Sequence, residues 1–162
     1  MRRRYCYEMP IGRVCIEDTD GKISAVYIKK TENIDSTELV VIEETDRIRE
    51  AKIQLEEYFR KERTEFDLPL YYEGTAFQRK VWEALQTIPY GQTRSYKEIA
   101  VQIGNPAACR AVGGANNKNR VMIVIPCHRV IGANGSLIGY GAGIDEKLFL
   151  LELERDGKDI IN

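Results

Sequence analysis

The pattern of residues changes near Gly74, and this change constrains the fold more than any other feature of the chain. Residues 11–29 are rich in Ile, Val and Tyr on both sides of an Asp-Thr-Asp-Gly turn, which is typical of an antiparallel hairpin. Residues 46–63 repeat apolar side chains at helical spacing. After Gly74 the chain consists of short helical segments that end at glycine or proline. We therefore predict an α/β (α+β) chain with a small antiparallel N-terminal domain at residues 1–72 and a mainly helical domain at residues 75–162.

Two capping boxes open helices in the second domain. The segments Thr75-Ala-Phe-Gln78 and Ser95-Tyr-Lys-Glu98 each place Gln or Glu three residues after a hydroxyl side chain. The helix after Ser95 is expected to end at a Gly-Asn-Pro segment, and a further helix to follow over residues 107–116. Two short helices joined by a tight turn form a helix-turn-helix pattern, although many such pairs are only packing units.

The helix at residues 107–116 has an unusual surface for a DNA reader. Its only long basic side chain is Arg110, and the rest of that surface consists of small residues: Ala107, Ala108, Ala111, Gly113, Gly114 and Ala115. Small residues allow the close approach of a backbone, which suits the narrow minor groove of DNA. They equally allow the helix to pack tightly against a neighbouring helix, and the sequence favours neither interpretation.

Charge is divided unevenly along the chain. The whole sequence has a net charge of −1, but residues 1–74 carry 13 basic and 17 acidic side chains, whereas residues 75–162 carry 11 and 8. Between residues 79 and 129 there are 8 basic and only 2 acidic side chains. This separation is what a surface facing phosphates needs, although a basic face that contacts only solvent is the common alternative.

The chain has a single histidine, His128, and it directly follows Cys127 in the run Ile-Val-Ile-Pro-Cys-His-Arg-Val. A thiol reacts mainly as its thiolate, and imidazole is the side chain best suited to remove the thiol proton near neutral pH. A buried packing cysteine is the plainer explanation of an arbitrary Cys-His pair. Here the pair follows an apolar, strand-like run and precedes an arginine, which favours a nucleophile and its base.

The other cysteines show no metal or disulfide pattern. The chain lacks a CxxC pair, so we expect no zinc site. We expect free thiols, because the spacing is irregular and the N-terminus lacks the apolar stretch of a signal peptide. No apolar run approaches the roughly 18 residues of a membrane span, so we expect a cytoplasmic protein. The four cysteines are Cys6, Cys15, Cys109 and Cys127.

The motifs of residues 75–155, taken in order, resemble the O6-alkylguanine-DNA alkyltransferases, which are the methylated-DNA–protein-cysteine methyltransferase family. Residues 1–72 match that family only in length and in the order of elements. The motifs are Gly104-Asn105-Pro106, Arg110-Ala111-Val112-Gly113-Gly114-Ala115, Asn119, Ile125-Pro126-Cys127-His128-Arg129-Val130, Gly139-Tyr140 and Leu150 to Glu154.

The resemblance implies a protein that accepts an alkyl group irreversibly on its own cysteine. Cys127 matches the acceptor, His128 the base that activates it through a bound water, and Glu154 the carboxylate that orients the histidine. Asn119 matches a residue that stabilises the turn before the acceptor. Tyr140 matches the pocket tyrosine that protonates guanine N3. The logic is that of nucleophile, base and orienting acid.

The resemblance also implies a winged-helix-like second domain that binds double-stranded DNA containing alkylated guanine or thymine. Arg110 matches the arginine that enters the duplex when the damaged nucleotide is flipped, and Tyr96 matches the tyrosine that presses on the target phosphate. We expect a monomer that needs no cofactor or metal. The expected DNA-binding residues are Tyr96, Arg110, Ala111, Gly113, Gly114 and Arg129.

Two positions depart from the family pattern, and two other functions stay open. Gly141 and Met122 replace residues that commonly line the pocket, which affects tolerance for bulky alkyl groups. An alkyltransferase-like protein binds lesions without transfer, but such proteins lack the acceptor cysteine. A cysteine hydrolase or transferase acting on a small molecule explains Cys127 and His128, but not the basic stretch.

Overall fold

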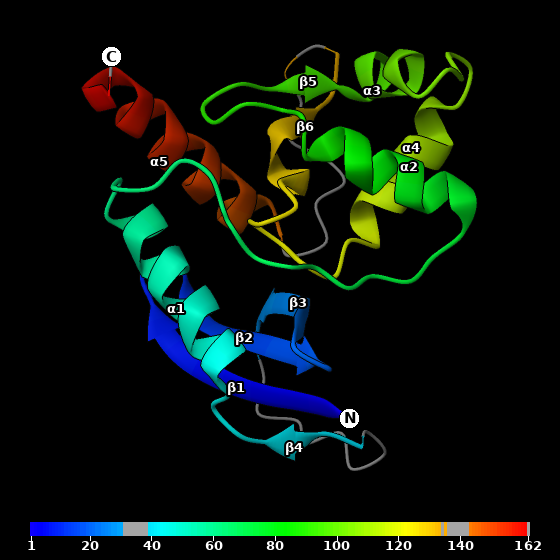
Figure 1. Cartoon of the computed structure of the whole chain (residues 1–162). Coiled ribbons are helices and arrows are strands. Elements are labelled where there is room, and N and C mark those ends of the chain that lie inside the picture. Colours follow the sequence, from blue (N-terminus) through cyan, green and yellow to red (C-terminus); the bar gives the residue numbers. More distant parts are fainter. Residues whose placement is uncertain (31–38, 134, 136–142, 162) are drawn as a thin grey trace. The chain divides into compact units, whose positions relative to one another are not determined.

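The protein consists of two compact units, Met1–Tyr72 and Glu73–Asn162. The structure is a computed structural model that describes residues 1–30, 39–133, 135 and 143–161, with only the backbone of residues 156–161 (Figure 1). No helix in these described ranges is long and apolar enough to cross a membrane.

The first unit contains a mixed sheet with the strand order β3-β2-β1-β4. The predicted hairpin is confirmed as the antiparallel pair β2 and β3. Two strands were not predicted: β1, which begins with three arginines, and β4, which pairs in parallel with β1 and so makes the sheet mixed rather than purely antiparallel. The strands are β1 (Arg2–Met9), β2 (Gly12–Thr19), β3 (Lys22–Ile28) and β4 (Val41–Ile42).

Helix α1 (Asp46–Phe59) packs against β1, β2 and β3 and forms the core of the first unit with them. It ends four residues earlier than the predicted residue 63, because Arg60 caps it and Lys61 adopts a left-handed φ of 63°. The consecutive β2 residues Val14 to Asp18 are all buried, so both faces of this strand are covered. The fully buried side chains of this core include Val14, Ile16, Ile48, Ala51, Leu55 and Tyr58.

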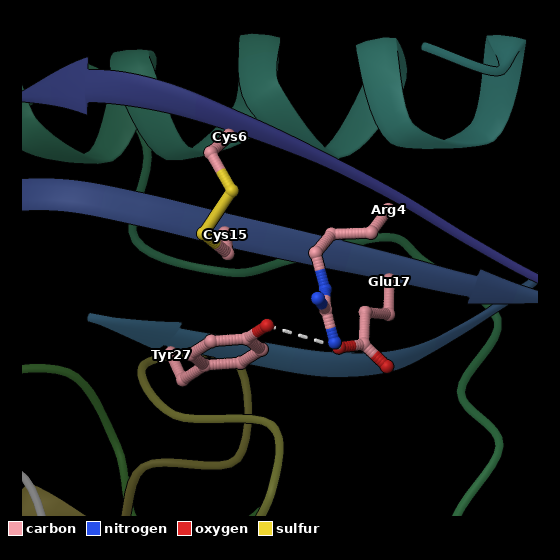
Figure 2. Close-up of a disulfide and its surroundings, with 5 residues drawn as sticks. All are labelled: Arg4, Cys6, Cys15, Glu17 and Tyr27. Carbon is pink, nitrogen blue, oxygen red and sulfur yellow. Dashed lines mark hydrogen bonds and ion pairs between the residues drawn. A yellow bond between two sulfur atoms is a disulfide. The ribbon is translucent and has the colours of Figure 1, made fainter. Parts of the chain in front are cut away.

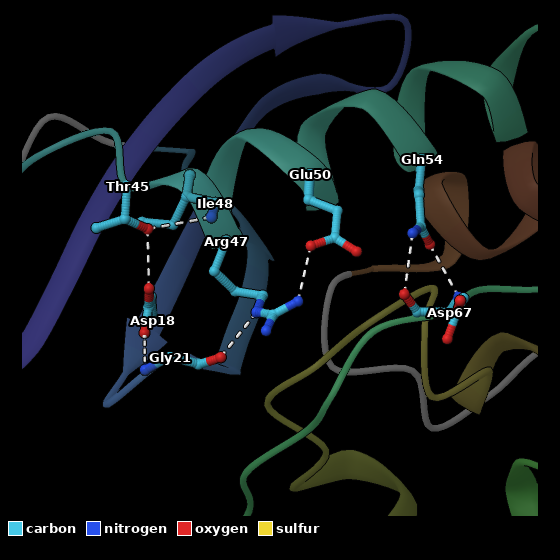
Figure 3. Close-up of polar contacts among 8 residues, drawn as sticks. All are labelled: Asp18, Gly21, Thr45, Arg47, Ile48, Glu50, Gln54 and Asp67. Atoms are coloured by element: carbon cyan, nitrogen blue, oxygen red, sulfur yellow. Dashed lines mark hydrogen bonds and ion pairs between the residues drawn. The ribbon is translucent and has the colours of Figure 1, made fainter.

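The hairpin turn and the start of α1 are connected by one carboxylate (Figure 3). Asp18 Oδ1 accepts a hydrogen bond from the Gly21 amide at 2.7 Å, and its Oδ2 accepts one from the Thr45 hydroxyl at 2.8 Å. Thr45 is the N-cap of α1 and accepts from the Ile48 amide. Further along the helix, the buried side chain of Gln54 makes two hydrogen bonds with the backbone of Asp67 and so fixes the extended segment that closes the unit.

Cys6 and Cys15 form a disulfide, and the expectation of four free thiols was therefore wrong for this pair (Figure 2). The two residues lie directly opposite each other in the antiparallel register of β1 and β2, with 4.0 Å between their Cα atoms. The disulfide could not be predicted because it depends on the register of β1 and β2, and β1 itself was not predicted. Next to the disulfide, Glu17 accepts hydrogen bonds from Arg4 and from the hydroxyl of Tyr27.

The second unit consists mainly of helices, and both predicted capping boxes are confirmed. Thr75 caps α2 with Gln78 in return, and Ser95 caps α3 with Glu98 in return. The predicted helix-turn-helix is the pair α3 and α4, which pack against each other and against α2. The elements are α2 (Ala76–Leu85), β5 (Arg94–Ser95), α3 (Tyr96–Gln102), α4 (Cys109–Asn117), the 3-10 turn η1 (Cys127–Arg129), β6 (Val130–Ile131) and α5 (Ile144–Ile161).

Two local predictions in this unit were wrong. Helix α4 begins at Cys109 rather than at residue 107, and its N-cap, Ala108, offers no side-chain acceptor. The apolar run before Cys127 is a turn rather than a strand, and Cys127 itself starts a 3-10 turn. Short apolar runs are compatible with several local structures, so periodicity alone did not separate them.

The disulfide yields a prediction about stability. Replacing both Cys6 and Cys15 with Ser is expected to lower the free energy of unfolding by about 2–3 kcal/mol, because the crosslink closes a short loop and limits the unfolded chain. Urea denaturation followed by circular dichroism measures the difference. A reductant should destabilise the wild type and leave the double variant unchanged; an equal response of both proteins would contradict a stabilising role for the disulfide.

Candidate active site and nucleic-acid interface

Cys127 is a buried thiol at the start of a short turn in the second unit. Its side chain is 4% exposed, and it is one of two free cysteines in the described ranges, the other being the half-buried Cys109. Two polar side chains lie close enough to interact with its charge. Burial raises the pKa of the Tyr96 phenol, and Cys127 adds to this rise. Burial lowers the pKa of the Lys147 ammonium, and Cys127 opposes this fall. The thiol therefore lies among groups that respond to its ionisation.

The turn that precedes Cys127 is held by Asn119. The side-chain amide of Asn119 donates to the carbonyl of Ile125 at 2.8 Å, and its oxygen accepts from the amide of Val121 at 3.0 Å. Between these two contacts Ile123 adopts a φ of 72°, a left-handed conformation that is costly for a β-branched residue. Such a conformation persists when the surroundings determine it, and the two hydrogen bonds of Asn119 supply part of that support.

Glu154, on α5, is the most heavily contacted polar group of the site. Its Oε2 lies 2.5 Å from Nε2 of His128 and 3.0 Å from Nη2 of Arg129. Its Oε1 accepts from Nε of Arg129 at 2.8 Å and from the amide of Gly91 at 3.1 Å. The carboxylate is 1% exposed, so these contacts replace the water that a free carboxylate would bind.

These contacts determine the protonation of the pair. Burial raises the pKa of Glu154, but hydrogen bonds from His128 and Arg129, together with the positive charge of Arg129, outweigh it and hold that pKa well below its usual range. Burial lowers the pKa of His128, so the imidazole is neutral at neutral pH. An ionised carboxylate beside Nε2 places the proton there and leaves the lone pair on Nδ1. Nδ1 is buried and makes no hydrogen bond within the described residues. The arrangement is that of a base with an orienting acid.

Arg129 is a correction to the expected DNA-binding set. The residue is 6% exposed, its Nη1 donates to the carbonyl of Ile88 at 2.7 Å, and its other nitrogens contact Glu154. A guanidinium that makes a two-point contact with a carboxylate inside the unit is not available to a phosphate. Its position next to Cys127 and His128 in the sequence did not distinguish a surface arginine from a buried one.

The buried side of α5 carries polar as well as apolar residues. Leu148 is 40% exposed, whereas Lys147, Leu150 and Glu154 are buried. These three residues are spaced i, i+3 and i+7, which places them on one side of a helix. The buried side is therefore defined by two charged residues and one leucine.

Sequence reasoning missed two polar residues that contact the backbone around Cys127. Lys147 is fully buried, and its Nζ donates to the carbonyl of Val130 at 2.5 Å. Asn116 is 2% exposed, and its Nδ2 donates to the carbonyl of Cys127 at 3.3 Å. The only warning for Lys147 was its spacing from Leu150, and Asn116 carried no signal that separated it from the exposed Asn117 beside it.

Helix α4 divides into a buried face and an exposed face of small residues. Arg110, Ala111 and Gly114 are exposed, and Val112, Ala115 and Asn116 are buried. A Cβ added to Gly113 would lie 3.8 Å from the ring of Tyr96, an ordinary van der Waals contact, so α4 faces the start of α3 here with room for a small side chain. An exposed arginine among Ala and Gly is an arrangement that a nucleic-acid groove can accommodate.

One expected site residue lies outside the described residues, namely Tyr140, and the same holds for Gly141. Met122, the other departure from the family pattern, is buried in the turn before Cys127. The structure therefore brings together Cys127, His128, Glu154, Asn119 and Tyr96 in one unit, with Arg110 on the exposed face of α4.

Comparison with known proteins gives matches over both units. Residues 76–156 match the family described as "6-O-methylguanine DNA methyltransferase, DNA binding domain", and residues 3–72 match "6-O-methylguanine DNA methyltransferase, ribonuclease-like domain". The chain is 51% identical to a methylated-DNA–protein-cysteine methyltransferase of Methanosarcina acetivorans over 149 residues, which are 91% of this chain and 95% of that protein.

Solved structures agree with the sequence matches. The O6-methylguanine methyltransferase of Mycobacterium tuberculosis has a TM-score of 0.90 at 42% identity, and the match covers 100% of both chains. OGT of the same organism in complex with DNA has a TM-score of 0.86 at 44% identity, covering 96% of this chain and 94% of that one.

The depressed pKa of His128 predicts how stability depends on pH. Unfolded histidine takes up a proton below about pH 6.5, whereas the buried imidazole resists it, so the unfolded state binds more protons and stability falls as the pH drops from 7 toward 5. The slope should approach one proton per molecule, measured by urea denaturation at each pH. Because the chain has one histidine, His128→Gln should remove this step. An unchanged pH dependence in that variant would contradict the assignment.

Proposed function

The chain belongs to the methylated-DNA–protein-cysteine methyltransferase family, and we propose that the cysteine on which it accepts the methyl group is Cys127. It repairs DNA by transferring a methyl group from O6-methylguanine to an active-site cysteine, and DNA is its partner. The observation that carries the assignment to Cys127 is the buried contact of the next residue, His128, with Glu154, in which Nε2 lies 2.5 Å from Oε2. Cys109, the other free thiol of the described ranges, has no histidine beside it.

In the proposed reaction, Nδ1 of His128 takes the thiol proton of Cys127 through a bound water. The thiolate sulfur then attacks the methyl carbon of O6-methylguanine. The sulfur–carbon bond forms as the carbon–oxygen bond breaks, and the electron pair of that bond stays on O6. Guanine takes up one proton at N3, which balances the proton released by Cys127. We propose Tyr140 as its donor. Because Cys127 keeps the methyl group, each protein molecule reacts once.

The same proposal assigns supporting roles. Glu154 orients His128, and Asn119 holds the turn that leads to Cys127 through its bonds to Ile125 and Val121. Arg129 fixes Glu154 by a two-point contact, a role that replaces its expected contact with DNA. Together these groups hold the base rigidly before the substrate arrives, which is how preorganised polar groups accelerate a reaction.

On the DNA side, we propose that residues 75–162 form the DNA-binding and acceptor domain and residues 1–72 a separate N-terminal domain. O6 of a stacked base is out of reach of a buried thiol, so the damaged nucleotide must leave the duplex. The exposed Arg110 fills the space it leaves, Tyr96 presses on its phosphate, and Ala111, Gly113 and Gly114 allow the helix to approach the groove.

We further propose activity on O4-alkylthymine, action as a monomer and, because the substrate is DNA, a cytoplasmic location.

The acceptor assignment is tested by mass spectrometry. After mixing with a duplex containing O6-methylguanine, the intact protein should gain the mass of one methyl group, and peptide mapping should place it on Cys127. Cys127→Ala should still bind the duplex and gain nothing. Methylation of Cys109 instead would show that Cys109, and not Cys127, is the acceptor. Tight, lesion-selective binding without any mass gain in the wild type would indicate a lesion-binding protein of the alkyltransferase-like kind.

The proposed flipping role of Arg110 predicts different losses with two substrates. Arg110→Ala should slow methyl transfer from duplex DNA by about a hundredfold or more, since the variant lacks the side chain that stabilises the extrahelical state. Reaction with the free base O6-methylguanine should be nearly unchanged, because a free base needs no flipping. Single-turnover rates with both substrates give the comparison, and Arg110→Lys tests whether charge alone is sufficient. Equal losses with duplex and free base would place Arg110 in the chemistry of the pocket.

A further inference from the structure

Asn116 joins helix α4 to the backbone of the nucleophile. It lies in the last turn of α4 with its side chain 2% exposed, and its Nδ2 donates to the carbonyl oxygen of Cys127 at 3.3 Å. The neighbouring carbonyl, that of Ala115, accepts a hydrogen bond from Nε1 of Trp82 at 2.8 Å, so this end of α4 is fixed on α2. The position of the Cys127 backbone therefore depends on the end of a helix that is itself held in place.

Of the two polar atoms of the Asn116 side chain, only Nδ2 makes a hydrogen bond to a described residue. A carbonyl partner requires a donor, so the nitrogen of the amide faces Cys127 and the orientation of the side chain is determined. The other end, Oδ1, is buried and makes no hydrogen bond to any described residue. Leaving a buried acceptor without a partner costs about 1–3 kcal/mol, and folded proteins rarely accept this cost for packing alone. An apolar side chain of similar volume would fill the same space without that cost.

Three side chains hold carbonyls along the segment that contains Cys127. Asn119 holds the carbonyl of Ile125, and Lys147, on α5, holds that of Val130. Asn116 holds the carbonyl of Cys127 itself, and it alone of the three does so from a helix that also has an exposed face bearing Arg110. A displacement of α4 is thus transmitted directly to the residue that reacts.

We propose that Asn116 is a positioning residue for methyl transfer, which fixes the Cys127 backbone relative to the DNA-facing helix α4. The inference rests on the proposed role of Cys127 as acceptor. Displacement at the methyl carbon requires the sulfur, carbon and leaving oxygen to be nearly in line, and a misplacement of about 1 Å can cost a hundredfold in rate. The amide contact removes one of the motions by which the sulfur would leave that line when α4 binds DNA.

Asn116→Leu keeps the approximate volume and removes the donor. With excess protein and a duplex containing O6-methylguanine, the single-turnover rate constant should fall about ten- to a hundredfold. The Kd of the Cys127→Ala protein for the same duplex should not change when Asn116→Leu is added. The matched control is Gln86→Leu, which removes an amide that donates to another carbonyl of the same unit, that of Trp82 at 3.2 Å. Because Gln86 is exposed, this control should leave the rate constant unchanged.

Asn116→Asp separates positioning from folding by its pH profile. A carboxylate at this site repels the carbonyl of Cys127, whereas a protonated carboxyl donates to it, and burial raises the pKa of the introduced group. The ratio of the rate of Asn116→Asp to that of the wild type should therefore rise as the pH is lowered. For Asn116→Leu the same ratio should stay constant with pH, because leucine has no proton to gain.

The outcomes are distinguishable. Wild-type rates in both Asn116 variants, or rate losses that follow only the Kd or the melting temperature, would overturn the positioning role. A pH-independent ratio for a folded Asn116→Asp would do the same. If the wild type itself places no methyl group on Cys127, the proposed acceptor is wrong, and this is established before any Asn116 variant is measured.

Discussion

The second unit depends on one buried carboxylate. Glu154 is removed from water, which by itself would cost several kcal/mol, and its contacts with His128, Arg129 and the Gly91 amide offset that cost. These partners come from the loop after α2 and from η1, so the same contacts that keep the carboxylate ionised also bring α5, η1 and that loop together. Loss of one partner would leave a charge uncompensated in the interior, and chemistry and folding are therefore coupled at this residue.

Features decided by neighbours in sequence were predictable. The two capping boxes, the β2–β3 hairpin and α1 follow from local hydrogen bonding and from apolar periodicity, and the structure contains all of them. The juxtaposition of Cys127 and His128 was also visible in the chain. The predictions that failed concerned contacts between residues that are far apart in the sequence. The Cys6–Cys15 bond depends on the register of β1 and β2, and the burial of Arg129 depends on Glu154, 25 residues away.

The error at Arg129 and the failure to predict Lys147 share a physical cause, which is the burial of polar groups. Lys147 and Glu154 occupy the inward side of α5 because each finds a partner there, a carbonyl for one and a guanidinium and imidazole for the other. A hydrophobicity pattern assigns such residues to the surface by default, since it contains no information about which polar groups form hydrogen bonds with each other. Active sites are where this default fails most often, because reactions need polar groups shielded from water.

The position of Trp82 has a consequence for observing this protein at work. It is the only tryptophan of the chain, it is 4% exposed, and its indole nitrogen donates to the last-turn carbonyl of α4 at Ala115. Indole emission responds to the hydrogen bond of that nitrogen and to the polarity around the ring. The fluorescence of Trp82 is therefore expected to report on the helix end next to Cys127, without an attached dye, when DNA binds and when Cys127 is methylated.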